Sequence, residues 1–131
     1  MKILLDTHIA LRAIADDPKL PAQARTLIAD TDNTIVVSAA SVWEIAIKHA
    51  LAGGGPNDMT ISGTKALKYF HAAGYELLAI TAAHAAAVER LKTRHADPFD
   101  RLLVAQALSE PLRLLTHDRS VASYSDTIML V

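Results

Sequence analysis

Residues 2–15 read Lys2-Ile-Leu-Leu-Asp-Thr-His-Ile-Ala-Leu-Arg-Ala-Ile-Ala15. A short apolar run ends at Asp6, and the residues after it repeat their apolar positions with helical spacing. This stretch predicts a buried strand over residues 2–5 that leads directly into a helix over residues 7–15.

The same alternation continues along the chain. Four further apolar runs are predicted strands: residues 34–37, 75–80, 112–115 and 127–130. Segments with helical spacing lie between them and are predicted helices: residues 21–30, 39–51, 64–73, 82–94 and 98–109. Strands that alternate with helices are joined by right-handed crossovers and build a parallel sheet covered on both faces. We therefore predict an α/β fold of three layers around a mostly parallel central sheet of about five strands.

Length and composition favour one globular domain. The 131 residues are 51% hydrophobic, which is enough for a sizeable core, so we expect a single domain over residues 1–131. No apolar run approaches the roughly 20 residues needed to cross a bilayer, and Asp6 interrupts the N-terminal run. We expect a cytoplasmic protein with no membrane contact. The mean hydropathy of +0.22 has two explanations, a partner over an apolar face or a sheet buried on both faces.

Charge and cysteine content limit the possible ligands. The chain has no Cys, so a metal ion must be held by oxygen or imidazole. Lys and Arg total 13 against 14 Asp and Glu, so a nucleic-acid site requires a local basic patch.

Two acids follow predicted strands. Asp6 comes directly after residues 2–5, and Asp118 follows residues 112–115 after Thr116 and one further residue. In an open parallel sheet, ligands bind beyond the carboxyl ends of the strands, where the strand order reverses. Each acid taken alone is also explained as the N-cap of the next helix.

Glu44 interrupts an apolar helical segment. With Ser41 and Lys48 it forms one narrow polar stripe, which favours a position in a cleft between packed elements. The alternative is an exposed stripe with a Glu-Lys ion pair that contributes a few tenths of a kcal/mol. The adjacent Trp43 is predicted to lie in the core.

A third acidic segment, Asp97-Pro-Phe-Asp100, opens a predicted helix. Capping explains all of it, with Asp97 as N-cap and Pro98 in the first turn, but a helix N-terminus also suits a phosphate.

If Asp6, Glu44, Asp100 and Asp118 converge, each like-charged pair at about 4 Å costs on the order of 4 kcal/mol. A hard divalent cation would neutralise them, and Mg²⁺ or Mn²⁺ suits an all-carboxylate site better than Zn²⁺.

Four segments resemble the PIN-domain ribonucleases of the VapC-like toxin family: Leu4-Leu-Asp-Thr-His8, Ser38-Ala-Ala-Ser-Val-Trp-Glu-Ile-Ala-Ile-Lys48, His95-Ala-Asp-Pro-Phe-Asp-Arg-Leu-Leu-Val-Ala-Gln106 and Leu114-Leu-Thr-His-Asp118. The resemblance spans nearly the whole chain. It implies a metal-dependent endoribonuclease that uses Mg²⁺ or Mn²⁺ to cut RNA. It also implies a homodimer and a toxin held inactive by a cognate antitoxin protein.

The resemblance assigns roles residue by residue. Asp6 and Asp100 match the acids that most directly hold the metal, while Glu44 and Asp118 match those that complete the site. From this match we predict Asp6, Asp100 and Asp118 as metal ligands. Thr116 matches a hydroxyl that orients an acid or a water, and Thr7 either helps in the same way or is an ordinary threonine near a helix start.

Two loops depart from the family pattern. Residues 51–56 read Leu-Ala-Gly-Gly-Gly-Pro where relatives have a compact Leu-Gly-Lys turn, and residues 91–94 replace a turn that often contains proline.

Basic residues are predicted to rim the cleft and contact RNA: Lys48, Lys92, Arg94, Arg101 and Arg119. Three histidines flank the predicted site and either support a metal ligand or contact RNA, or have ordinary surface or capping roles: His8, His95 and His117.

Two rival functions remain. A phosphoacceptor receiver domain has similar length and alternation, but it needs paired acids after the first strand, and only Asp6 is present there. A non-catalytic PIN-like module that binds RNA or protein is the stronger rival. Since all four acids are retained, the sequence favours the nuclease.

Overall fold

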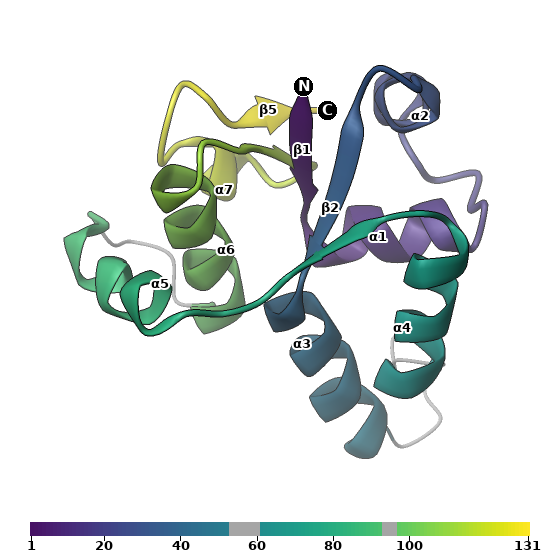
Figure 1. Ribbon diagram of the computed structural model, residues 1–131, viewed down its shortest axis with the longest axis horizontal. Helices are drawn as coiled ribbons and strands as arrows, with labels where there is room; N and C mark the ends of the chain where they lie inside the picture. The colour runs from purple at the N-terminus through teal and green to yellow at the C-terminus, as the bar shows by residue number, and fades with distance from the viewer. Residues whose placement is uncertain (53–60, 93–96) are drawn as a thin grey trace.

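The computed structural model describes residues 1–52, 61–92 and 97–131. The described strands form one five-stranded parallel sheet in the order β3-β2-β1-β4-β5: β1 Lys2–Leu5, β2 Thr34–Ser38, β3 Glu76–Leu78, β4 Arg113–Thr116 and β5 Met129–Leu130. The helices are α1 Thr7–Ile14, α2 Ala22–Ala29, α3 Ala39–Ala50, α4 Gly63–Ala72, α5 Ala82–Ala87, the 3₁₀ helix η1 Val88–Arg90, α6 Pro98–Ser109 and α7 Arg119–Ala122 (Figure 1).

The strand order reverses at β1. The chain passes from β1 to β2 and β3 on one side, then crosses to β4 and β5 on the other. Leu4 lies opposite Val36 of β2 and Leu114 of β4, so β1 is paired along both edges. The pairing continues past the strand end, because the backbone N–H of Asp6 donates to the carbonyl of Leu115 over 3.0 Å. Asp6 therefore lies at the switch point between β1 and β4.

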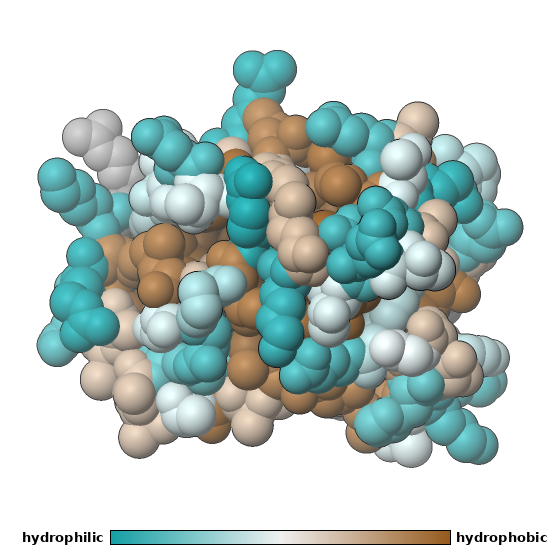
Figure 2. All heavy atoms as spheres, turned by 45° about the horizontal axis from the view of Figure 1, so that its top comes forward, coloured by the Kyte–Doolittle hydropathy of each residue, from teal (hydrophilic) through white to brown (hydrophobic). Residues whose placement is uncertain are grey.

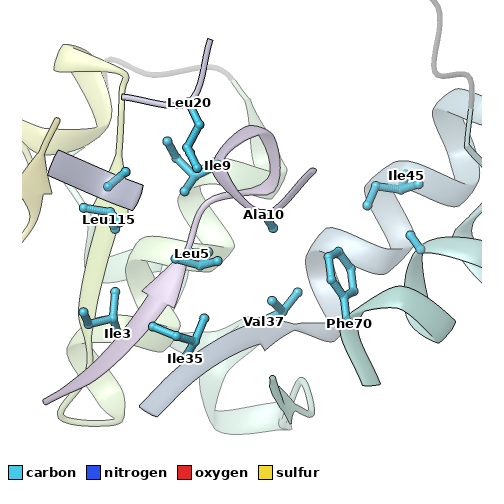
Figure 3. Packing of buried hydrophobic residues seen from close by; sticks show 12 residues of the cluster. Ile3, Leu5, Ile9, Ala10, Leu20, Ile35, Val37, Ile45, Phe70 and Leu115 are labelled. Carbon is cyan, nitrogen blue, oxygen red and sulfur yellow. The ribbon is translucent and has the colours of Figure 1, made fainter. Parts of the chain in front are cut away.

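Helices cover both faces of the sheet. Successive side chains of a strand point to opposite faces, so Ile3 and Leu5 pack on one side and Leu4 on the other. The first face carries α1, α2 and α4, with Phe70 of α4 fully buried there (Figures 1 and 3). The second face carries α6 and α7. The predicted three-layer α/β fold is confirmed, and its sheet is parallel throughout the described strands.

Several predicted boundaries were wrong. The strand predicted over residues 75–80 is only Glu76–Leu78, and the strand predicted over 127–130 is only Met129–Leu130. Both are edge strands and pair on one side only. The helix predicted over 82–94 ends as η1, after which Leu91 is extended. The four-residue helix α7 was not predicted, because it is too short to display a period.

The burial of the sheet accounts for much of the high hydropathy. All three apolar residues of β1 are completely buried, as expected for a strand covered on both faces. Apolar side chains are also exposed, since Trp43 of α3 is 53% exposed and Tyr69 of α4 is 48% exposed. The prediction of a core position for Trp43 was therefore wrong. On the face shown in Figure 2, hydrophilic residues are interspersed with smaller hydrophobic areas.

None of the helices within the described ranges combines the length and apolar character that a membrane span requires.

Candidate functional site

Asp6 is held at the carboxyl end of β1 by two hydrogen bonds. It is the N-cap of α1, and its Oδ1 accepts from the backbone N–H of Ile9 over 3.1 Å. Its Oδ2 accepts from the hydroxyl of Thr116 at the end of β4 over 2.6 Å. Only 6% of Asp6 is exposed. The parallel pairing of β1 with β4 brings these two residues together across 110 positions of sequence.

Thr116 connects Asp6 to Asp118. Its buried hydroxyl donates to Asp6 and accepts from the backbone N–H of Asp118 over 3.0 Å. Asp118 is exposed and caps α7, where its Oδ1 accepts from the backbone N–H and the hydroxyl of Ser120 over 2.8 and 2.6 Å. One hydroxyl therefore fixes the side chain of one acid and the backbone of another.

Glu44 is the more deeply buried acid, at 2% exposure. It lies on α3, which follows β2 directly and is capped by Ser38. Lys48 Nζ donates to Glu44 Oε2 over 2.6 Å, whereas Oε1 is buried and has no hydrogen-bond partner. The polar stripe predicted on this helix is present, but the exposed-stripe alternative is wrong for Ser41 and Glu44, which are both buried.

The first turn of α6 brings further acids to this lysine. Asp97 caps the helix and accepts from the backbone N–H groups of Phe99 and Asp100 over 2.9 and 3.3 Å. The hydrogen bond that Lys48 donates to Glu44 is the largest influence raising the pKa of Lys48. The charges of Glu44, Asp97 and Asp100 raise this pKa further, while partial burial lowers it. Lys48 is thus electrostatically coupled to acids of both α3 and α6.

Side-chain contacts join the helices that carry the acids. The rings of Trp43 on α3 and Phe99 on α6 meet edge to face, with centroids 4.9 Å apart and planes at 75°. Between α1 and α3, the hydroxyl of Thr7 donates to the hydroxyl of Ser41 over 2.9 Å. Thr7 follows Asp6, and Ser41 lies one turn before Glu44, so this bond connects the two buried acids through their own helices.

The acids lie in two groups. Asp6 and Asp118 are connected through Thr116, while Glu44 and Asp100 are coupled through Lys48. Within the described ranges, no three acidic or imidazole side chains form a group that could hold a metal ion.

The donor chemistry fits a hard cation, because Glu44 Oε1 is a buried carboxylate oxygen that lacks a donor. Leaving such an oxygen without a partner is unfavourable, and an oxygen-preferring divalent ion would satisfy it.

A match to a family model shows to which protein family this chain belongs. The PIN domain model matches residues 3–126. The chain belongs to the PIN-domain family. None of the curated proteins matches it in sequence.

Solved structures similar to this PIN domain share its fold. VapBC2 from Rickettsia felis, in a complex with a promoter DNA fragment, is 19% identical with a TM-score of 0.70, covering 100% of this chain and 98% of that one. VapBC-5 from Mycobacterium tuberculosis is 20% identical with a TM-score of 0.63, covering 99% and 98%. FitAcB from Neisseria gonorrhoeae is 18% identical with a TM-score of 0.60, covering 98% and 96%.

The predicted basic residues of this PIN domain differ in their contacts. Arg101 donates from Nη2 to the carbonyl of Val88 over 3.4 Å, whereas Lys92 and Arg119 are exposed. Arg94, which was predicted to contact RNA, and His95, which flanks the predicted site, lie outside the described residues, as does the Gly53–Pro56 stretch.

The two remaining histidines near the site are exposed. His117 is bonded through Nδ1 to the carbonyl of Val131, and His8 lies on the first turn of α1.

Sequence reasoning missed a buried polar chain behind the site. Ser38 donates its hydroxyl to Gln106 Oε1 over 2.5 Å, and Gln106 Nε2 lies 3.3 Å from Nδ1 of the buried His84. The backbone N–H of Thr81 also donates to His84 Nδ1, so the ring proton is on Nε2, which faces Glu110 at 2.8 Å. The only sequence signal was the presence of single polar residues in apolar segments.

Proposed function

We propose that this PIN domain is a metal-dependent endoribonuclease that hydrolyses RNA phosphodiester bonds at a site formed by Asp6, Glu44, Asp100 and Asp118. The observation that carries the proposal is the pair of buried acids behind the carboxyl edge of the sheet, Asp6 at the switch point and Glu44 with an unpartnered oxygen. Lys48 compensates one oxygen of Glu44, but the other oxygen is buried without a donor, so the burial of these acids in a PIN domain supports a cation site.

Mg²⁺ or Mn²⁺ is the proposed cofactor, with Asp6, Asp100 and Asp118 as ligands and Glu44 as the acid that completes the site. When bound, such an ion activates water and stabilises the negative charge that develops on phosphorus oxygens. The protein contributes preorganisation. Thr116 keeps Asp6 and the backbone of Asp118 in fixed positions, and Asp97 caps α6, the helix that carries Asp100.

RNA is the proposed substrate, although the net charge of −1 gives no general attraction to a polyanion. Binding would depend on local basic residues near the acids, and the exposed Lys92 and Arg119 are candidates for phosphate contacts. Arg119 directly follows the proposed ligand Asp118, so it would meet the backbone of any RNA bound there.

The proposed biological role is that of a toxin held inactive by a cognate antitoxin, in the cytoplasm and as a homodimer of a single-domain chain over residues 1–131. The support is the similarity to a toxin–antitoxin complex from Klebsiella pneumoniae and to VapBC-5, a member of the VapBC family of toxin–antitoxin systems. A groove of about 460 Å³ between α1 and α4 is lined by apolar residues such as Leu11, Ile14, Ile61 and Tyr69. It would accept an apolar segment of such a partner.

Cleavage of total RNA by the pure, antitoxin-free protein tests this proposal. Wild type, Asp6→Asn and Asp100→Asn are compared in Mg²⁺, Mn²⁺ or EDTA, with Asp126→Asn as the matched control. Asn is as good an N-cap as Asp, so Asp6→Asn should preserve α1. Asp126 is exposed and precedes the amino end of β5, whereas the proposed site lies beyond the carboxyl ends of the strands.

We expect metal-dependent cutting by wild type and Asp126→Asn, and none by the other two variants. Cutting that persists in Asp6→Asn and Asp100→Asn would refute the proposed site. Inactivity of folded wild type on several RNAs would instead favour the non-catalytic binding module.

A further inference from the structure

Lys48 is the positive charge in direct contact with the most buried acid of the site. Its Nζ lies 2.6 Å from Glu44 Oε2, and the Glu44 side chain is 3% exposed while that of Lys48 is 44% exposed. An ion pair between exposed side chains contributes little, but a carboxylate buried to this degree needs a compensating charge. Lys48 therefore supplies the charge that compensates the buried carboxyl group of Glu44.

The same carboxylate has a second oxygen that Lys48 does not satisfy. Glu44 Oε1 is buried and lacks a hydrogen-bond partner. A carboxylate can accept at both oxygens, so Glu44 presents one compensated oxygen and one open coordination position. Glu44 Oε1 can therefore bind a second ligand in addition to the lysine that contacts Oε2.

Lys48 also interacts with the first turn of α6. After its hydrogen bond to Glu44, the charges of Asp97 and Asp100 help to raise the pKa of Lys48. The ammonium group of Lys48 is thus bonded to Glu44 of α3 and is also influenced by the charges of the first turn of α6, including that of the proposed metal ligand Asp100. A divalent cation held by these acids would share its surroundings with a like charge.

We propose that Lys48 is an internal counter-ion that competes with the metal: its ammonium compensates Glu44 while the site is empty and leaves Glu44 when the divalent cation binds. This inference rests on the proposed metal-dependent function. Because the ammonium and the cation repel each other, the charge of Lys48 weakens metal binding and sets the metal concentration at which the site fills.

Calorimetric titration with Mn²⁺ tests this competition. Wild type is compared with Lys48→Met, with Lys48→Arg, which keeps the charge, and with Lys2→Met. Lys2 lies at the amino end of β1, and its ion-pair partner within the described residues is the exposed Glu76, so Lys2→Met removes the same charge from the opposite end of the strands.

Lys48→Met should bind Mn²⁺ about tenfold more tightly than wild type or more, whereas the other two variants should remain within about twofold. Equal or weaker binding by Lys48→Met, with wild type still binding, overturns this inference and leaves the proposed function intact. Absence of Mn²⁺ binding by all four proteins overturns both.

A second measurement uses wild type alone and does not depend on the folding of a variant. The rate at which an acetylating reagent modifies Lys48 is followed by mass spectrometry without metal and at Mg²⁺ concentrations that saturate the site. Release from Glu44 should raise the rate for Lys48 severalfold and leave that of Lys2 unchanged. An unchanged or lower rate at Lys48 in the saturated protein contradicts the proposed displacement.

Discussion

Replacing Thr116 with valine removes one hydroxyl from the buried end of β4 and changes the side-chain volume little. Two hydrogen bonds are lost, the donation to Asp6 Oδ2 at 2.6 Å and the acceptance from the Asp118 backbone N–H at 3.0 Å. A bond to a charged group contributes about 1.5–3 kcal/mol and a neutral one about 1 kcal/mol. Because Thr116 and Asp6 are both buried, we expect a loss of about 3 kcal/mol in the free energy of unfolding.

Urea unfolding followed by circular dichroism in EDTA measures this loss. Thr116→Ser is the control, since it keeps the hydroxyl and loses one methyl group, at a cost of about 1 kcal/mol. Thr116→Val should therefore be about 2 kcal/mol less stable than Thr116→Ser. If the valine variant is as stable as the serine variant, the hydroxyl does not hold Asp6 in the way described.

Three further predictions concern the core, the ion pair and the basic surface. Phe70→Ala should lower the free energy of unfolding in urea by about 3–5 kcal/mol because Phe70 is fully buried. Tyr69→Ala, at the exposed neighbouring position, should lower it by less than about 1 kcal/mol, and similar losses for both variants would contradict the packing of α4. Since the pKa of Lys48 is raised above 10.5, the contribution of Lys48 to stability is complete below pH 10.5 and declines as the pH rises through the raised value. Lys48→Met should therefore flatten the loss of stability that wild type shows at alkaline pH, and an unaltered pH profile would refute this. Neutralising the exposed Lys92 and Arg119 together should slow RNA cleavage and reduce the slope of log affinity against log salt by about 1–2, and an unchanged slope would exclude them as phosphate contacts.

The sheet could be predicted because its signals are local. The apolar run before Asp6 and the one before Thr116 each contain buried residues on both faces, as central parallel strands require. The edge strands β3 and β5 were predicted too long because their limits depend on pairing with a single neighbour. The helix α7 escaped prediction because four residues contain no helical period.

The acids at the strand ends could be located for a similar reason, since the carboxyl ends of parallel strands share one edge. The bonds that hold them could not be predicted. Thr7 meets Ser41 across 34 residues and Ser38 meets Gln106 across 68, and no periodicity relates such positions. Lys48 was recognised as the i,i+4 partner of Glu44, and the narrow polar stripe favoured a cleft position for Glu44. The contact of Trp43 on α3 with Phe99 on α6 could not be predicted, because it joins helices that are distant in the sequence.

Anomalous diffraction from crystals of the antitoxin-free protein soaked in Mn²⁺ tests most directly whether the acids form one metal site. The account predicts a manganese peak within coordinating distance of carboxylate oxygens of both Asp6 and Asp100, and its loss in Asp100→Asn crystals. Full manganese occupancy elsewhere on the protein, with no peak at these carboxylates, would contradict it.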